Sequence, residues 1–253
     1  MLLISICNFS EIYLIKCLLR NTKLKLLSYY LNYEGFLIMI ICIGDSHSSI
    51  FSKKNEIIEV WPKKSFKFYS KIKPIRIGAA TAYNLKNKIQ LINSILDKVF
   101  YFKNSYVMFC FGEVDIRAHI IKQASLQNRD VEHLVKECVE RYIESLDGIK
   151  LRKNINKVVW GPIASWSIEK PYDGPSYGTN LERNYLTRVF NGYLKEKCLE
   201  KNIIFVSIFE KMLNSDGTTN SYFLDDLGAG IHLNINSIPL IRTELKKNNL
   251  TFL

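Results

Sequence analysis

The sequence predicts an α/β fold in which a five-stranded parallel sheet lies between two layers of helices, a three-layer α/β/α sandwich. From residue 37 onward, continuous apolar runs alternate with longer amphipathic stretches. Runs without polar alternation are typical of parallel strands that are buried on both faces and joined by crossover helices. Small polar clusters follow these runs, as expected at the carboxyl ends of strands in a doubly wound sheet. The chain of 253 residues is 47% apolar, which is enough for one substantial core.

Five apolar runs are predicted to form the strands. In chain order they are FLIMIICI (36–43), IKPIRIG (72–78), SYVMFCFG (105–112), NKVVWGPI (156–163) and NIIFVSIF (202–209). Between them, apolar residues at helical spacing predict helices over 83–100, 129–149 and 181–202, and a last helix over 235–248. This order of elements indicates one domain that covers residues 37–253.

Residues 1–36 precede the first predicted strand, and we expect them to be an N-terminal extension that is either helical or upstream of the native start. Glu11 and Lys16 interrupt the apolar segment MLLISICNFSEIYLIKCLL, and no basic segment precedes it. Neither a signal peptide nor a membrane-spanning helix is therefore predicted. The overlapping segment IKCLLRNTKLKLL combines apolar and basic residues, a pattern that suits weak contact with a membrane surface.

The bulk composition bounds the partners and the compartment. Lys and Arg outnumber Asp and Glu by 35 to 24, a net charge of +11. The lysines are scattered and form no stripe interleaved with aromatic residues, so nucleic acid is not an expected partner. The six cysteines form no CxxC pair and no metal-ligand spacing, and we expect buried free thiols. Free thiols favour the reducing cytoplasm as the location.

The first predicted strand ends in GDSH (44–47), where Asp45, Ser46 and His47 are adjacent. Three interpretations fit this cluster: a nucleophilic serine, an Asp-x-His metal pair, and a serine that caps a helix. A binuclear metallophosphoesterase needs further His and Asp ligands at other strand ends. The chain has only four histidines and neither a Gly-Asn-His nor a Gly-His-x-His block. We therefore predict no metal and no cofactor.

Four blocks, in their order along the chain, resemble the SGNH (GDSL-like) hydrolase family over roughly residues 37–240. GDSH is similar to the nucleophile block, and IRIGAATAYNL (75–85) is similar to the second block, whose glycine, here Gly78, lends a backbone N–H to the oxyanion hole. FCFGEVDIRAHI (109–120) stands where the family has Gly-x-Asn-Asp, and GIHLN (230–234) resembles the histidine block. The resemblance implies the SGNH hydrolase fold with a flavodoxin-like sheet, Ser46 as nucleophile and His232 as general base.

Two positions depart from the family pattern. The family's triad aspartate lies three residues before the histidine, where this chain has Ala229. The nearest acids are Asp225 and Asp226; we favour Asp226 as the partner of His232, with a Ser-His dyad as the alternative. The asparagine that donates to the oxyanion corresponds to Val114, which has no side-chain donor.

Charged residues are dense in the third block, where Glu113, Asp115, Arg117 and His119 occur within seven residues at a strand end. They are predicted to bind the oxyanion or the substrate, with Arg117 replacing the missing amide donor or binding an anionic part of the substrate. A structural ion-pair network among them is the alternative. His47 is expected to pack at the start of the helix and not to act as the base.

The resemblance implies a serine esterase that removes an O-acyl group from a carbohydrate or a small ester, so the expected partner is a small-molecule or glycan ester. A subgroup of similar proteins that combines GDSH with GE-x-D-x-R is associated with surface-polysaccharide assembly, which suggests the carbohydrate. Two alternatives remain: a glycan O-acyltransferase, and a catalytically degenerate SGNH-like protein that binds a glycan or a partner.

Overall fold

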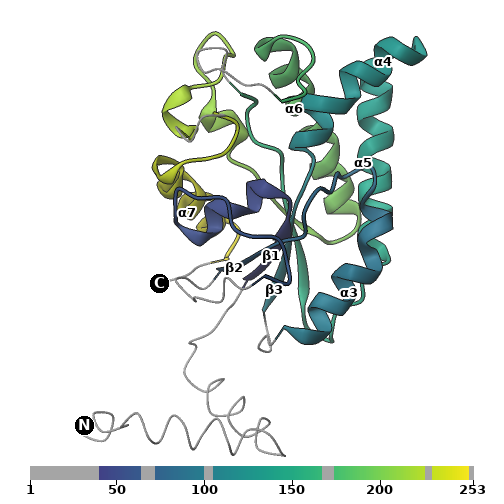
Figure 1. Cartoon of the computed structure of the whole chain (residues 1–253), viewed down its shortest axis with the longest axis vertical. Coiled ribbons are helices and arrows are strands. Elements are labelled where there is room, and N and C mark those ends of the chain that lie inside the picture. The colour runs from purple at the N-terminus through teal and green to yellow at the C-terminus, as the bar shows by residue number, and fades with distance from the viewer. Residues whose placement is uncertain (1–39, 64–71, 100–104, 167–173, 226–229, 251–253) are drawn as a thin grey trace, which may run out of the picture. The chain divides into compact units, whose positions relative to one another are not determined.

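The computed structural model describes residues 40–63, 72–99, 105–166, 174–225 and 230–250, all of which fall within Ile38–Leu253. The predicted N-terminal extension and the first residues of the first predicted strand lie outside these ranges. Five strands are present: β1 (Ile40–Gly44), β2 (Ile72–Arg76), β3 (Tyr106–Cys110), β4 (Asn156–Trp160) and β5 (Ile204–Val206). They pair in parallel in the order β2-β1-β3-β4-β5 (Figure 1). This is the predicted flavodoxin-like sheet.

Both faces of the sheet are apolar, which explains the continuous apolar runs in the sequence. Along β1, Ile41 and Ile43 belong to one core cluster, whereas Ile40 and Cys42 belong to the other. All four side chains are fully buried. Since successive side chains of a strand point to opposite faces, each face needs its own layer of helices.

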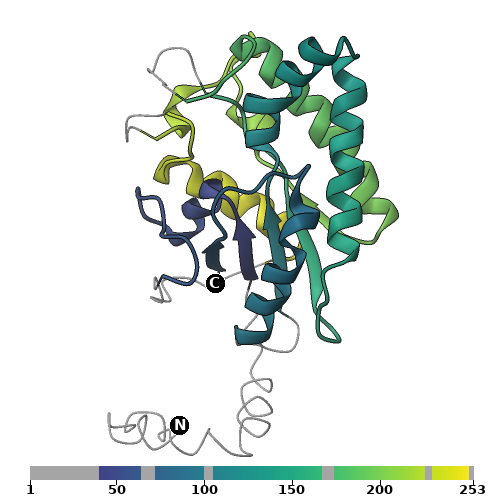
Figure 2. The same ribbon diagram turned by 45° about the vertical axis from the view of Figure 1, so that its right-hand side comes forward.

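Helices cover the two faces as the strand pattern requires. One layer contains α3 (Ile89–Lys98), α5 (Val131–Asp147) and α6 (Asn180–Glu200). The opposite layer contains the short helix η1 (Ser46–Ser52) and α7 (Ile238–Lys247). Figures 1 and 2 show α7 on the other side of the sheet from α3 and α5. The three-layer α/β/α sandwich and the four predicted helices are therefore confirmed.

Side chains at the helix starts explain where two of the long helices begin. Asp130 accepts a hydrogen bond from the backbone N–H of His133 and so caps α5. At α6, Thr179 and Glu182 form a capping box in which each side chain accepts from the other residue's backbone N–H. Such caps satisfy backbone donors that have no partner within the helix. The remaining short helical turns are η2 (Leu85–Lys88), η4 (Phe209–Met212), η5 (Ser221–Phe223) and η6 (Ile235–Ser237).

One helical segment was not predicted from the sequence. A π-helix, η3 (Asp115–Ile120), continues into α4 (Ile121–Gln127) directly after β3. Its buried face includes Asp115 and Arg117, and these polar residues interrupt the apolar spacing that identifies a helix. Four of the five predicted strands, all except the first, also extend too far at their carboxyl ends. After Arg76, Cys110 and Trp160 the chain leaves the sheet and forms loops.

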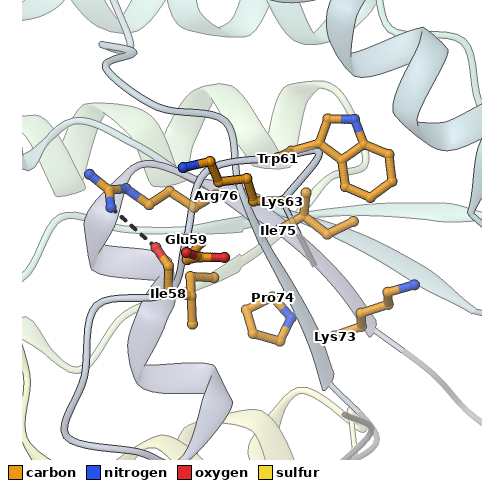
Figure 3. A pocket seen from close by; sticks show the side chains of 8 residues that line it. All are labelled: Ile58, Glu59, Trp61, Lys63, Lys73, Pro74, Ile75 and Arg76. Carbon is orange, nitrogen blue, oxygen red and sulfur yellow. Dashed lines mark hydrogen bonds between the residues drawn. The ribbon is translucent and has the colours of Figure 1, made fainter. Parts of the chain in front are cut away.

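A loop covers the exposed edge of the sheet at β2. Val60 forms a single parallel bridge with Arg76, and the Trp61 N–H donates to the Arg76 carbonyl at 2.8 Å. The guanidinium of Arg76 donates to the carbonyl of Ile58 at 3.1 Å, the dashed line in Figure 3. Covering an edge strand protects its backbone groups from pairing with another chain. The shallow pocket at this edge is lined by Ile58, Glu59, Trp61, Lys63, Lys73, Pro74, Ile75 and Arg76.

The cysteines that the structure describes are all buried. Cys42, Cys110, Cys138 and Cys198 are buried free thiols, as predicted. The other two cysteines, Cys7 and Cys17, lie outside the described residues. Across the described ranges, none of the helices combines the length and the apolar character that crossing a bilayer requires.

Gly44 ends β1 where a side chain has no room. A Cβ there would lie 2.7 Å from the Cys110 carbonyl oxygen and 2.9 Å from the Cβ of Ser48. We expect Gly44→Ala to lower the free energy of unfolding by about 1–3 kcal/mol, because β1 must move away from Cys110 of β3 and from Ser48 of η1 to make room for the added methyl group. Gly192, in the middle of α6, has nothing within 4 Å of an added Cβ. Gly192→Ala should instead stabilise by about 0.5–1 kcal/mol. Equal urea-unfolding midpoints for the two variants would contradict this packing.

Candidate active site

Ser46 is the first residue of η1 and is separated from the end of β1 by Asp45 alone. The helix is capped by its neighbour: Asp45 Oδ1 accepts a hydrogen bond from the His47 backbone N–H at 2.8 Å. The cap is therefore Asp45, and the interpretation of Ser46 as a helix cap is wrong. The Ser46 hydroxyl lies 2.9 Å from Nε2 of His232, with which it forms a hydrogen bond.

His232 is held on its other side by an aspartate. Its Nδ1 lies 3.2 Å from Oδ2 of Asp225, whose carboxyl side chain is only 5% exposed. Because an ionised carboxylate can only accept, Nδ1 carries the proton and the lone pair of Nε2 faces the Ser46 hydroxyl. Serine, histidine and aspartate thus form a continuous hydrogen-bonded chain, which is the arrangement of a nucleophile with its general base.

Antiparallel pairing, and not spacing along the chain, brings this aspartate to the histidine. The Asp225 N–H donates to the His232 carbonyl at 2.8 Å, and Leu224 pairs with Leu233 in an antiparallel bridge. The two ends of the loop are thereby side by side. The residue favoured from the sequence, Asp226, lies outside the described residues, and the carboxylate at Nδ1 is that of Asp225. The family's aspartate lies three residues before the histidine, where this chain has Ala229. Here an aspartate seven residues before His232 contacts Nδ1 instead.

A second imidazole lies against the first. The rings of His47 and His232 have centroids 4.8 Å apart and are tilted by 42°. Nε2 of His47 lies 2.8 Å from Oε2 of Glu113, and both side chains are about 5% exposed. The other carboxylate oxygen of Glu113 accepts from Nε of Arg117 at 2.7 Å. One carboxylate thus joins the ends of β1 and β3, which are neighbours in the sheet.

Burial and charge act in opposite directions on this network. Burial alone raises the pKa of Glu113, but His47 and Arg117 outweigh it, so the pKa falls to about 2. Burial lowers the pKa of His47, but the charges of Glu113 and Asp45 outweigh it, so the pKa is raised. The network therefore joins the Glu113 carboxylate to the Arg117 guanidinium and to an imidazole whose pKa it raises. A buried charge is tolerated when it is paired and hydrogen-bonded in this way.

His232 responds in the opposite sense. Burial is the main cause that lowers its pKa, and the neighbouring charge of His47 lowers it further, whereas Asp225 raises it in part. Its pKa therefore lies below the ordinary value near 6.5. An imidazole that is uncharged at neutral pH is in the form that a general base requires.

A cleft of about 540 Å³ opens at Ser46. Gly78, the predicted oxyanion glycine, lines this cleft together with Val114 and His119. The backbone φ of Gly78 is +84°. The backbone at Gly78 is in the left-handed region, which disfavours other residues. Val114 has no side-chain donor, as expected. Ser46 and Gly78 thus lie in the wall of the same cleft, as an oxyanion site built from backbone N–H groups requires.

The remaining charged residues of the third block serve the frame of the site. Arg117 is buried; it binds Glu113, and its Nη1 donates to the Pro175 carbonyl at 2.8 Å. Asp115 accepts from the backbone N–H groups of Ala82 and Tyr83 at 2.7 and 3.1 Å. Of the four charged residues predicted to bind oxyanion or substrate, His119 alone is among those that line the cleft. The alternative of a structural ion-pair network describes Glu113 and Arg117.

The Asp-x-His pair is arranged differently from metal ligands. Asp45 is buried, which raises its pKa to about 6, and its Oδ1 caps η1. His47 directs Nε2 to Glu113. In the part of the chain that the structure describes, no three His, Cys, Asp or Glu side chains converge as a metal-ligand set.

Comparison with known proteins supports the fold. No protein-family model and no curated protein matches the sequence. Among solved structures, a candidate acylhydrolase from Bacteroides fragilis NCTC 9343 matches with a TM-score of 0.50 and 13% identity, over 91% of this chain and 98% of that one. The chain has the SGNH hydrolase fold. A G-D-S-L lipolytic protein from Veillonella parvula DSM 2008 is also similar, with a TM-score of 0.45 and 15% identity over 83% of this chain and 97% of that one. A carbohydrate acetylesterase from Sinorhizobium meliloti has a TM-score of 0.46 and 14% identity over 84% of this chain and 97% of that one.

Within the SGNH fold, the pairing of His47 with Glu113 was missed from the sequence. The two residues are 66 positions apart, and no local pattern connects them. A signal was present nonetheless, since each follows a strand, and the two strands are adjacent at the point where a flavodoxin-like sheet reverses its winding. Charged residues of opposite sign at two adjacent strand ends are candidates for a buried pair.

Glu113→Gln would leave the Arg117 guanidinium and the His47 imidazole buried without their carboxylate, and it should lower the free energy of unfolding by about 3 kcal/mol at pH 7. Because folding lowers the pKa of Glu113 from near 4.5 to about 2, its contribution is complete above pH 4.5 and is lost as the pH falls through 2. The difference in free energy of unfolding between wild type and variant should therefore become smaller as the pH is lowered. Urea unfolding at several pH values measures this difference.

The matched control for this experiment is Glu210→Gln. Glu210 pairs with Arg188, and both side chains are more than half exposed. Loss of such a surface pair should cost less than about 1 kcal/mol. Equal effects of the two substitutions at pH 7 would mean that the buried network does not stabilise the fold.

Proposed function

We propose that this protein is a serine esterase. The observation that carries the proposal is the hydrogen-bonded chain from the Ser46 hydroxyl through His232 to Asp225, placed at the mouth of the cleft. Neither interaction is explained by a structural role of the serine, because Asp45 already caps the helix. This chain of groups supplies a nucleophile, a base and an orienting carboxylate, which acyl transfer requires.

In the proposed mechanism, the Ser46 oxygen attacks the acyl carbonyl of the ester while Nε2 of His232 accepts the hydroxyl proton. The negative charge on the carbonyl oxygen is stabilised by the backbone N–H groups of Ser46 and Gly78. The tetrahedral intermediate then expels the alcohol, which takes its proton from His232. A water molecule, deprotonated by His232, hydrolyses the acyl-serine and restores the enzyme.

The substrate that we favour is an O-acyl group on a carbohydrate or on a small alcohol. The volume of the cleft supports a small ester, and its polar lining, which includes Thr81, Asn84 and Asn87, supports a hydrophilic alcohol part. A glycan O-acyltransferase is the variant in which a sugar hydroxyl replaces water in the second step. A degenerate binding protein is disfavoured because serine, histidine and aspartate are in hydrogen-bonding contact. The buried free thiols support a reducing, cytoplasmic location.

Ser46→Ala should lower kcat on aryl acetates and mono-acetylated sugars by roughly 10⁶-fold, because the nucleophile is lost. The far-UV circular dichroism and the unfolding midpoint should stay close to those of wild type. Hydrolysis by the variant at the wild-type rate would contradict the proposal.

For wild type, kcat/KM should fall in acid with a midpoint below pH 6.5, since the pKa of His232 is lowered and protonation removes the base.

The two adjacent aspartates offer a matched comparison. Asp225→Asn should lower kcat by roughly 10⁴-fold, because an amide no longer fixes the tautomer and no longer stabilises the imidazolium. Asp226→Asn should leave kcat near the wild-type value. The opposite result, with the larger loss at Asp226, would assign the orienting carboxylate to the neighbouring residue and contradict the geometry at Nδ1.

A further inference from the structure

A second hollow, of about 240 Å³, lies beside the cleft that contains Ser46. Three residues line both spaces: Thr81, Asn84 and His119. The cleft and the second hollow therefore adjoin each other at these three residues, which belong to the second block and to η3. A substrate group that extends from an acyl carbonyl at Ser46 past these residues would enter the second hollow.

Hydrogen-bonding side chains without formal charge dominate the entrance to this hollow. Thr81, Asn84, Gln123 and Gln127 contribute one hydroxyl and three amides, and His119 adds an imidazole. The side-chain amide of Gln127 donates to the side-chain carbonyl of Gln123 at 2.9 Å, and this hydrogen bond orients the amide of Gln123. An amide offers both donors and an acceptor, so this entrance complements a ligand that has many hydroxyl groups.

Apolar side chains form the inner part of the hollow. Ile120, Leu134 and Cys138 are buried there, and the ring of Tyr83 lies in the same lining. Polar groups at the entrance and apolar groups further in are typical of small-molecule sites, where the polar groups fix orientation. A sugar ring presents both kinds of surface, because its hydroxyls lie around the rim and its C–H groups lie on its faces.

The charged residues of the lining are already paired. Arg129 donates to Glu137 at 2.8 Å and to Gln127 at 3.3 Å. Asp115 accepts from two backbone N–H groups. A phosphate or carboxylate ligand would need cations that are not engaged elsewhere. A long acyl chain would need an apolar entrance. The lining suits neither of these groups.

We propose that this hollow is a subsite for one uncharged sugar ring, which forms the alcohol part of an ester whose acyl carbonyl lies at Ser46. The inference deepens the proposed esterase function and rests on it. Gln123 and Asn84 are the residues that hydrogen-bond the sugar hydroxyls, and they determine specificity without taking part in the chemistry.

The test compares two esters that share the acyl group. Gln123→Ala and Asn84→Ala should each lower kcat/KM for a mono-O-acetylated hexose by about three- to tenfold, the effect of losing one hydrogen bond to an uncharged group. Gln123→Ala should hydrolyse p-nitrophenyl acetate at the wild-type rate, because that ester has no hydroxyl-bearing ring and Gln123 lines the hollow but not the cleft at Ser46. Gln90→Ala is the control, since Gln90 is exposed on α3 and does not line the hollow; it should change neither rate.

Two results would overturn the subsite: equal losses of kcat/KM on both esters in Gln123→Ala, or no loss on either ester. Binding of the free hexose, measured by saturation-transfer NMR, separates the subsite from the esterase function. If wild type hydrolyses neither ester, the esterase proposal fails. Hexose binding that is weakened by Gln123→Ala would still support the subsite, and absence of hexose binding to wild type would reject it.

Discussion

The buried carboxylate of Glu113, held between the His47 imidazole and the Arg117 guanidinium, is the interaction on which the rest of the site depends. Its two oxygens bind Nε2 of His47 and Nε of Arg117 at 2.8 and 2.7 Å. A charge with so little exposure is stable only if it is paired, and removing the carboxylate would leave the buried Arg117 guanidinium without its counter-charge. The carboxylate therefore fixes the end of β1, where Ser46 lies, relative to the segment that follows β3.

Several parts of the site are held indirectly by the same network. Arg117 also accepts, through its carbonyl, from the N–H of Tyr177 and donates to the Pro175 carbonyl, so the loop before α6 is attached to η3. His47 lies against the ring of His232. Two imidazoles with opposite tasks are thus in contact. Glu113 raises the pKa of His47 and so favours its charged form, whereas burial, and to a lesser degree the neighbouring His47, lowers the pKa of His232 and favours its uncharged form.

The fold was predictable from the sequence because its signals are local. Strands buried on both faces appear as continuous apolar runs, and the long helices show helical spacing with capping residues such as Thr179 and Asp130. Ser46 and His232 were recognised from short blocks, and the structure places them in contact. Asp225 could not be selected, because antiparallel pairing across a loop decides which carboxylate meets Nδ1. Pairing of Glu113 with His47 depends on which strands are neighbours, a property of topology that no window of sequence contains.

We propose Ser46 as a nucleophile that His232 activates. Labelling of the folded full-length protein with a fluorophosphonate, followed by intact mass and peptide mapping, tests this activation most directly. We expect a single adduct on Ser46 that forms in wild type and fails to form in a folded His232→Ala variant. Absence of an adduct in folded wild type, or labelling of Ser46 that persists at the same rate without His232, would contradict it.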